Sequence, residues 1–164
     1  MNTLFADLRN LFKSIDNYNC FVCSDTNPIG LNLDIRYEDT TTYAIFNLSN
    51  LYSGFPSVIH GGIQATIIDE IGFWSMFNDI RQLGFTKSLS VEYLSQIQVD
   101  NDLKVVGEVI EYKDNIVKVK VEIISDSTAK TRGIVEYKTI NNNLVKKYFG
   151  EDFSKKFNKI IENN

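Results

Sequence analysis

The chain has 164 residues, of which 43% are hydrophobic and 23% charged, a balance typical of one soluble globular domain (1–164) with a substantial core. Its formal net charge of −4 disfavours a nucleic-acid-binding surface, because phosphate recognition needs clustered Lys and Arg. The first residues lack the basic start and apolar run of a signal peptide, and no stretch approaches the ~18 apolar residues of a membrane span. We therefore expect a cytoplasmic protein with no nucleic-acid or membrane partner.

An amphipathic helix is predicted within the N-terminal segment 1–19. Six apolar side chains recur at helical spacing between residues 3 and 16: Leu4, Phe5, Leu8, Leu11, Phe12 and Ile15. The opposite face is not strongly basic, so the pattern favours packing against the protein's own domain over binding to a membrane surface.

The two cysteines form the pair Cys20-x-x-Cys23. Such a pair can be redox-active or can supply half of a zinc site. A closed zinc site needs four ligands, whereas this chain offers two Cys and a single His, His60, which has a better explanation below. Zinc would therefore need a second chain, and we expect a structural or unreactive thiol pair and assign no metal ligand.

Strands and helices follow in a regular order. Alternating apolar and polar residues predict strands at 31–37, 43–48, 85–94, 103–112, 116–124 and 131–140. Helices are predicted at 62–78 and, within the C-terminal segment 144–164, at 151–162; turns at 27–30 and 141–143; and a loop at 51–59. The links between the last four strands are short, which favours antiparallel neighbours.

The helix at 62–78 is apolar on almost every side, so it must be buried on most sides. One antiparallel sheet with alternating strands offers a single apolar face to cover it. We therefore expect an α+β fold in which the sheet wraps around this helix. The helix also carries the adjacent acids Asp69 and Glu70, and buried carboxylates are costly unless they have partners or a task.

Three stretches carry a resemblance to a known family. They are GFPSVIHGGIQATIIDE (54–70), CFVCSDTNPIGL (20–31) and FTKSLSVEYL (85–94). The first is similar to a G-x-P-x-x-x-H-G-G…D-E signature, the second to a C-x-x-C-G-x-x-N-P-x-G-L lead-in, and the third to a threonine-bearing strand. Together with the order of elements, they resemble the PaaI-type acyl-CoA thioesterases of the hotdog fold. This resemblance spans residues 20–140 and implies an antiparallel sheet of about six strands around a central helix.

Hydrolysis of a thioester needs a base or nucleophile for the carbonyl carbon and donors for the oxyanion that forms. The first amides of a helix have no intrahelical partners and lie at the positive end of its dipole. Glycines there do not block an approaching carbonyl. The resemblance implies that the Gly61 N–H is the oxyanion donor, with Gly62 assisting, and that Asp69 is the general base or nucleophile. His60 would orient this loop or touch the thioester.

The spacing of Gly61 and Asp69 predicts a dimer. Asp69 follows Gly61 by eight residues, which is ~12 Å along a helix. One carbonyl cannot lie within ~3 Å of both groups in the same chain. If both act on one substrate, each site pairs Gly61 of one subunit with Asp69 of another, in a homodimer or a dimer of dimers.

Three further residues complete the predicted site. Thr86 would position water or the Asp69 carboxylate. Glu70 points about 100° away from Asp69 around the helix, which favours a hydrogen-bonded structural acid or a secondary site group. Phe73, one turn after Asp69, would line an acyl pocket. From charge alone, the phosphates of coenzyme A are expected to meet one of three cations: Arg81, Lys87 or Arg132.

The resulting prediction is hydrolysis of acyl-CoA thioesters, with no bound cofactor because coenzyme A is part of the substrate. Three alternatives stay open. A hotdog dehydratase or hydratase would aim His60 at the β-carbon of an acyl thioester. A non-catalytic acyl-CoA-binding protein would bind without turnover. A structural or redox module built on Cys20 and Cys23 would depend on its thiols.

Overall fold

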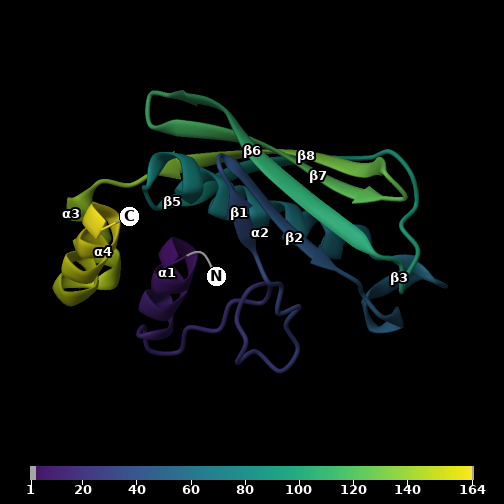
Figure 1. Cartoon of the computed structure of the whole chain (residues 1–164), viewed down its shortest axis with the longest axis horizontal. Helices are drawn as coiled ribbons and strands as arrows, with labels where there is room; N and C mark the ends of the chain where they lie inside the picture. The colour runs from purple at the N-terminus through teal and green to yellow at the C-terminus, as the bar shows by residue number, and fades with distance from the viewer. Residues whose placement is uncertain (1–2, 164) are drawn as a thin grey trace.

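A single long helix, α2 (Gly61–Ile80), lies at the centre of the computed structural model, which describes residues 3–163 (Figure 1). It begins after His60, whose ring Nδ1 accepts the N–H of Gly62 at 2.8 Å. It ends at Arg81, which adopts the left-handed backbone region at φ 56°. The helix predicted at 62–78 is confirmed and runs slightly further at both ends.

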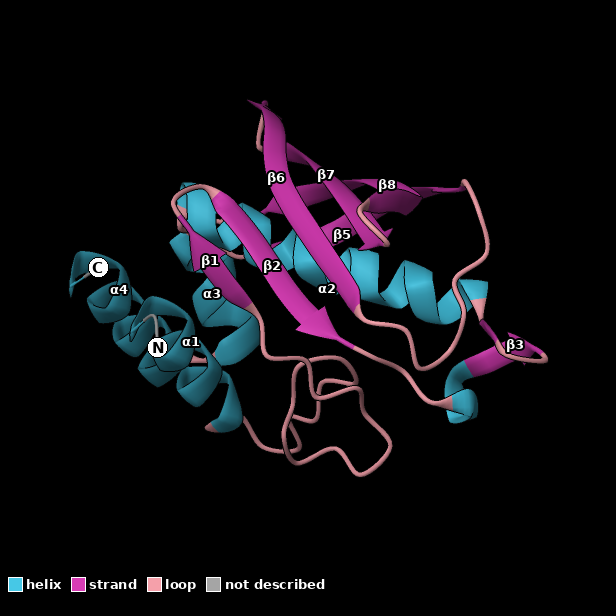
Figure 2. Ribbon diagram, turned by 45° about the vertical axis from the view of Figure 1, so that its right-hand side comes forward, coloured by secondary structure: helices cyan, strands magenta, loops and turns pink. Residues whose placement is uncertain are grey.

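A six-stranded antiparallel sheet covers α2, with the strand order β1-β2-β6-β7-β8-β5 (Figure 2). Its strands are β1 (Arg36–Glu38), β2 (Thr41–Phe46), β5 (Gly84–Tyr93), β6 (Leu103–Lys113), β7 (Ile116–Ser125) and β8 (Thr128–Thr139). A separate short hairpin consists of β3 (Ser53–Phe55) and β4 (Val58–Ile59). The predicted α+β arrangement of about six strands around a central helix is confirmed.

The inner face of the sheet packs closely on α2. Strand β7 buries the four alternate residues predicted to face inward: Val117, Val119, Val121 and Ile123. On the flanking strands, Gly107 and Gly133 present no side chain to the helix. A Cβ added at Gly133 would collide with Ile68 of α2, and one at Gly107 with Ser75. The two glycines therefore allow the helix to approach the sheet more closely than larger residues would.

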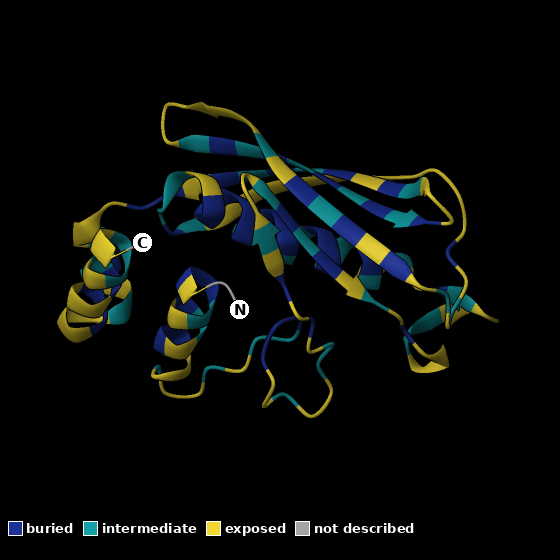
Figure 3. Cartoon of the chain, in the orientation of Figure 1, coloured by how far each residue is buried: buried dark blue, intermediate teal, exposed yellow. Residues whose placement is uncertain are grey.

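The remaining helices cover the C-terminal half of α2. They are α1 (Thr3–Lys13), α3 (Asn142–Phe149) and α4 (Glu151–Asn163). Aromatic rings join them to the centre: Phe5 of α1 lies against Trp74 with ring centroids 4.7 Å apart, and Phe157 of α4 lies 6.1 Å from Phe77. Figure 3 shows buried and exposed residues side by side on α1, as expected for an amphipathic helix packed on one side.

The strand predicted at 31–37 is wrong for most of its length, because only Arg36–Glu38 pair with a neighbouring strand. Asn32 adopts the left-handed region at φ 48°, which interrupts an extended backbone. The Leu33 N–H donates to the Val22 carbonyl in the preceding loop instead of to a strand. The predicted alternation persists only as burial, since Leu33 lies in the core while Asn32 is exposed.

The C-terminal segment contains two helices where one was predicted. The turn predicted at 141–143 is the start of α3, with Asn141 as its capping residue. Gly150, at φ 91°, separates α3 from α4 in a conformation that glycine adopts most readily. The loop predicted at 51–59 likewise holds short elements, a 3-10 turn (Asn50–Tyr52) and the β3–β4 hairpin.

None of the helices formed by residues 3–163 combines the length and apolar character needed to cross a bilayer. The sheet, α2 and the outer helices share one cluster of buried apolar residues. The division of the chain into a core at 20–140 with helical extensions stays a prediction.

The close contact at Gly133 can be tested by Gly133→Ala. The added methyl collides with Ile68, so we expect the free energy of unfolding to fall by about 1–3 kcal/mol, the usual cost of overpacking. Lys113→Ala, at the exposed end of β6, should change it by less than about 0.5 kcal/mol. Urea denaturation measures both, and equal stabilities for the two variants would contradict the tight packing.

Candidate active site

Asp69 lies on the flank of α2 nearest β5, and its side chain is partly exposed. The Thr86 hydroxyl of β5 donates to Asp69 Oδ1 at 2.8 Å. The Tyr137 hydroxyl of β8 donates to the Asp69 backbone carbonyl and lies 3.4 Å from the same Oδ1. Two hydroxyls therefore hold one carboxylate oxygen, while Oδ2 has no hydrogen-bond partner within residues 3–163 and is available to a ligand.

A β-bulge at Lys87 allows Thr86 to reach Asp69. Between Thr86 and Ser88, β5 advances by two residues while its partner β8 advances by one. Successive residues of a regular strand point to opposite faces, so Thr86 and Leu89, three positions apart, would lie on opposite sides if β5 paired regularly. The bulge places both on the side of the sheet that faces the helix. Thr86 therefore lies beside the carboxylate, as predicted. The bulge that places it there cannot be recognised from the alternation of apolar and polar residues.

Tyr137 is a site residue that the sequence analysis missed. It is buried on β8, and a Cβ added at Gly72 of α2 would overlap its hydroxyl. Burial, followed by the negative charge of Asp69, raises the pKa of Tyr137 well above its ordinary value, so the phenol stays a hydrogen-bond donor. Gly72, a small residue in a bulky apolar helix, is the sequence signal for this close approach.

The start of α2 presents one free backbone donor. The Gly62 N–H donates to His60 Nδ1 at 2.8 Å and so fixes the imidazole. An assisting role for Gly62 stays a prediction. The Gly61 N–H has no partner among the described residues, while the Gly61 carbonyl accepts the Tyr93 hydroxyl at 2.9 Å. Gly54 lies close to His60, because a Cβ there would be only 3.0 Å from His60 Cδ2. Gly61 is thus the donor that this geometry leaves available.

An open hollow of about 490 Å³ adjoins the helix start. Its walls are formed by Leu51, Tyr52, Ser53, His60, Ile63 and Thr66. Leu51 is 90% exposed, which leaves an apolar surface at the rim of the hollow. The mixture of apolar walls with a few polar groups is typical of sites for small molecules with a hydrophobic part.

Gly61 and Asp69 both lie on α2, as the spacing predicted, and one chain does not bring them together. Their separation along the helix is ~12 Å at the standard rise per residue. The carboxylate is held by β5 and β8, whereas Gly61 follows the β3–β4 hairpin at the helix start, between His60 and Gly62, which line the hollow. We refer to these two places as candidate half-sites, and their pairing across subunits stays a prediction.

Glu70 faces a different side of α2 from its neighbour Asp69. Its Oε1 accepts the indole N–H of Trp74 at 2.8 Å, and its Oε2 accepts the Cys20 thiol at 3.3 Å. Burial raises the pKa of Glu70 to about 7. The hydrogen-bonded structural acid foreseen from the sequence is the arrangement found, and no contact joins Glu70 to the half-site at Asp69 within residues 3–163.

Phe73 lies in the aromatic core instead of a pocket. Its ring centroid is 6.2 Å from that of Phe12 on α1 and 5.8 Å from that of Trp74. The helical spacing that placed it one turn beyond Asp69 is correct, but α1 covers that part of α2. A role for Phe73 in an acyl pocket therefore has no support in this geometry.

The three cations considered for the phosphates of coenzyme A are paired or distant from the helix start. Lys87 forms an ion pair with Glu136 at 3.0 Å, and Arg132 with Glu122 at 2.8 Å. Arg81 lies at the far end of α2, where its guanidinium donates to a backbone carbonyl. The sequence expectation based on charge therefore receives no support from the structure.

Comparison with known proteins places these features in context. Residues 57–131, which include β4, α2, β5, β6 and β7, match the sequence pattern of the thioesterase superfamily. None of the curated proteins matches the sequence significantly. Among solved structures, a thioesterase superfamily protein superposes with a TM-score of 0.68 at 17% identity, covering 73% of this chain and 62% of that protein, so this chain spans less than two thirds of its length.

Two other similar structures contain coenzyme A or its acetyl ester. A hypothetical thioesterase from Streptococcus pneumoniae TIGR4, solved with coenzyme A, has a TM-score of 0.62 at 19% identity and covers 67% of this chain and 90% of its own. A Streptococcus mutans UA159 protein bound to acetyl CoA has a TM-score of 0.62 at 15% identity and covers 67% and 90%. The hotdog fold and the resemblance to the thioesterase superfamily are thereby confirmed, while the PaaI type stays a prediction.

The capping role of His60 can be tested by His60→Ala and His60→Asn. Alanine removes the acceptor of the Gly62 N–H, so we expect the free energy of unfolding to fall by about 1 kcal/mol. Asparagine supplies a capping oxygen and should restore most of that loss. Thermal or urea unfolding compares the three proteins, and an alanine variant as stable as the wild type would argue against a structural role for the ring.

Proposed function

We propose that this protein is a PaaI-type thioesterase that hydrolyses acyl-CoA to free acid and coenzyme A. The observation that carries the proposal is the occurrence on one helix of a free N–H at Gly61 and a carboxylate at Asp69 whose second oxygen is available. The match of residues 57–131 to the thioesterase superfamily and the coenzyme A in two similar structures support the substrate class. No metal or bound cofactor is required by this scheme.

The proposed reaction uses the two groups in different steps. Water attacks the thioester carbonyl carbon while Asp69 Oδ2 accepts its proton, and the oxyanion that forms is stabilised by the Gly61 N–H. The tetrahedral intermediate then collapses, the C–S bond breaks, and the coenzyme A sulfur leaves with the proton from Asp69. In the alternative route, Oδ2 attacks the carbonyl directly and water hydrolyses the resulting anhydride. Thr86 and Tyr137 would orient the carboxylate in both routes.

The active unit would be a dimer in which Gly61 of one subunit faces Asp69 of the other. Strand β5 supplies a suitable surface, because it is the last strand of the sheet and one of its edges is unpaired in the described chain. Its residues Leu89 and Tyr93 pair with buried residues of β8 and face the helix side, yet they are 37% and 52% exposed. Apolar side chains along an open strand edge are typical of a subunit interface. A dimer of dimers would keep the same pair of sites.

The role of Asp69 can be tested by the release of free thiol from short, long and aromatic acyl-CoAs. We expect Asp69→Asn to lower kcat/KM at least ~100-fold, about 2.7 kcal/mol of transition-state stabilisation, because the amide cannot accept the proton of water. Asp79→Asn, which changes an exposed acid on the same helix, is the matched control and should retain full activity. No release by a folded, dimeric wild type would favour an acyl-CoA-binding protein instead.

The shared site can be tested by mixing two inactive variants. Gly61→Pro removes the N–H at the first position of a helix, where proline is otherwise tolerated, and we expect a loss of ~100-fold or more. Gly61→Ala keeps the N–H and controls for the contact of an added Cβ with the Tyr93 ring at 3.2 Å.

If the Gly61→Pro and Asp69→Asn chains are unfolded together and refolded, each mixed dimer contains one intact site and one doubly altered site. Random pairing should then restore about a quarter of the wild-type activity. Mixtures that stay as inactive as the separate variants would contradict a site formed from two subunits.

A further inference from the structure

A second cluster of chemically reactive groups lies on a different side of α2 from Asp69. Cys20, Cys23 and Glu70 each direct one potential ligand atom to a common point, and these atoms all lie within 4.8 Å of one another. Both thiols are free, Cys23 is buried and Cys20 is half-buried. The proposed hydrolysis uses none of these three groups, so the cluster needs an explanation of its own.

Two backbone N–H groups converge on the sulfur of Cys20. The N–H groups of Val22 and Cys23 both donate to Cys20 Sγ at 3.4 Å, and the Ser24 N–H closes the turn on the Cys20 carbonyl at 3.3 Å. The turn thus presents two sulfur atoms on one side, with the Cys20 sulfur fixed by two N–H donors.

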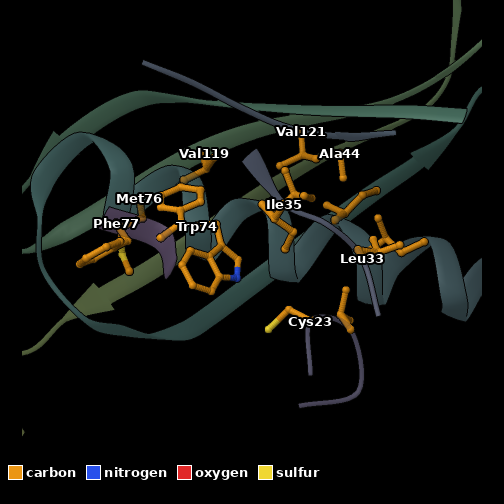
Figure 4. Close-up of a cluster of buried hydrophobic side chains, with 14 of the residues drawn as sticks. Cys23, Leu33, Ile35, Ala44, Trp74, Met76, Phe77, Val119 and Val121 are labelled. Atoms are coloured by element: carbon orange, nitrogen blue, oxygen red, sulfur yellow. The ribbon is translucent and has the colours of Figure 1, made fainter. Parts of the chain in front are cut away.

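Glu70 is oriented by a partner outside the cluster. The Trp74 indole N–H donates to Oε1 at 2.8 Å, which directs Oε2 to Cys20 Sγ at 3.3 Å. Figure 4 shows the indole of Trp74, a residue of α2, and Cys23 on the segment that precedes β1. A carboxylate that binds a metal is commonly held in this way, with one oxygen on a fixed donor and the other on the ion.

No cation of the described residues pairs with the carboxylate of this cluster. Glu70 forms no ion pair within residues 3–163. Buried charges are costly unless they are paired or bind a metal. A divalent cation at the common point would neutralise Glu70 and the two thiolates that form when the metal displaces the thiol protons.

We propose that Cys20, Cys23 and Glu70 bind one Zn²⁺ ion within each chain, through two sulfur atoms and one carboxylate oxygen. Zn²⁺ prefers sulfur at about 2.3 Å and carboxylate oxygen at about 2.0–2.2 Å in a tetrahedral arrangement, which places neighbouring ligand atoms ~3.5 Å apart. The separation of 3.3 Å between Cys20 Sγ and Glu70 Oε2 is close to that value. Water would occupy the fourth position, on the half-buried side of Cys20.

The sequence analysis placed zinc outside a single chain because it counted only cysteine and histidine as ligands. Glu70 lies 50 residues after Cys20, so spacing alone cannot reveal it as the third ligand. The ion would link the segment 18–35, which has few regular hydrogen bonds, to Glu70 on α2. Metal binding of this kind stabilises the fold directly and does not depend on the proposed hydrolase activity.

The proposal can be tested by titrating the reduced, metal-free full-length protein with Co²⁺, whose thiolate charge-transfer absorption reports sulfur ligation. We expect one equivalent per chain and displacement by Zn²⁺. Cys20→Ser and Cys23→Ser should each weaken binding at least ~100-fold, and Glu70→Gln ~10–100-fold with an altered Co²⁺ spectrum. Asp69→Asn, which changes the adjacent acid, is the matched control and should bind like the wild type. X-ray absorption of the Zn²⁺ form should count two sulfur ligands.

Several results would overturn the proposal. A folded, reduced wild type that shows no charge-transfer band, or that binds one ion per two chains, would do so. Equal affinity for wild type and Glu70→Gln would remove Glu70 from the site. If Glu70→Gln does not fold, the sulfur and oxygen count from X-ray absorption of the wild type decides the same question. Conversion of both thiols to a disulfide that Zn²⁺ does not prevent would instead indicate a redox pair.

Discussion

Helix α2 is enclosed by the sheet over most of its length, so each polar side chain on it must find a partner inside the protein or face an opening. Asp69 meets two hydroxyls from β5 and β8 and keeps one oxygen available. Glu70 meets an indole and a thiol on another side. The N-terminus of the helix emerges beside an open hollow, where the Gly61 N–H has no partner within residues 3–163. The candidate chemistry of the molecule is therefore concentrated at the few places where burial of this helix is incomplete.

An element could be predicted where the contacts that fix its conformation lie close together in the sequence. The apolar stretch of α2 and the alternation in β7 follow directly from which side chains are buried, so these elements were predicted correctly. The segment 31–37 alternates equally well, but its hydrogen bonds go to a preceding loop that the pattern does not encode. The helix predicted at 151–162 is present as α4, whereas α3, which ends at Gly150, was missed.

The residues of the candidate site likewise separate into those that a local motif predicts and those that only the fold brings together. Asp69, Gly61 and His60 stand in one contiguous motif, and the structure places each on the element expected. Tyr137 reaches the site from β8, 68 residues beyond Asp69, and the contact exists because Gly72 leaves room for the ring. Gly62 was assigned from the resemblance and Phe73 from helical spacing, yet the imidazole accepts the N–H of Gly62 and α1 packs against Phe73. Such competition between neighbours becomes visible only in three dimensions.

The bulge at Lys87 divides β5 into two parts whose side chains alternate in opposite phase. The number of residues between Thr86 and Leu89 therefore carries information that their identities do not. If β5 kept these residues but paired regularly, without the bulge, either the hydroxyl of the site or the apolar row of the open edge would turn to the outer face. A related sequence that lacks one residue at position 87 would keep both on the helix face in a regular strand, because Thr86 and Leu89 would then lie two positions apart. A gap of one residue there is therefore compatible with the same site and the same open edge.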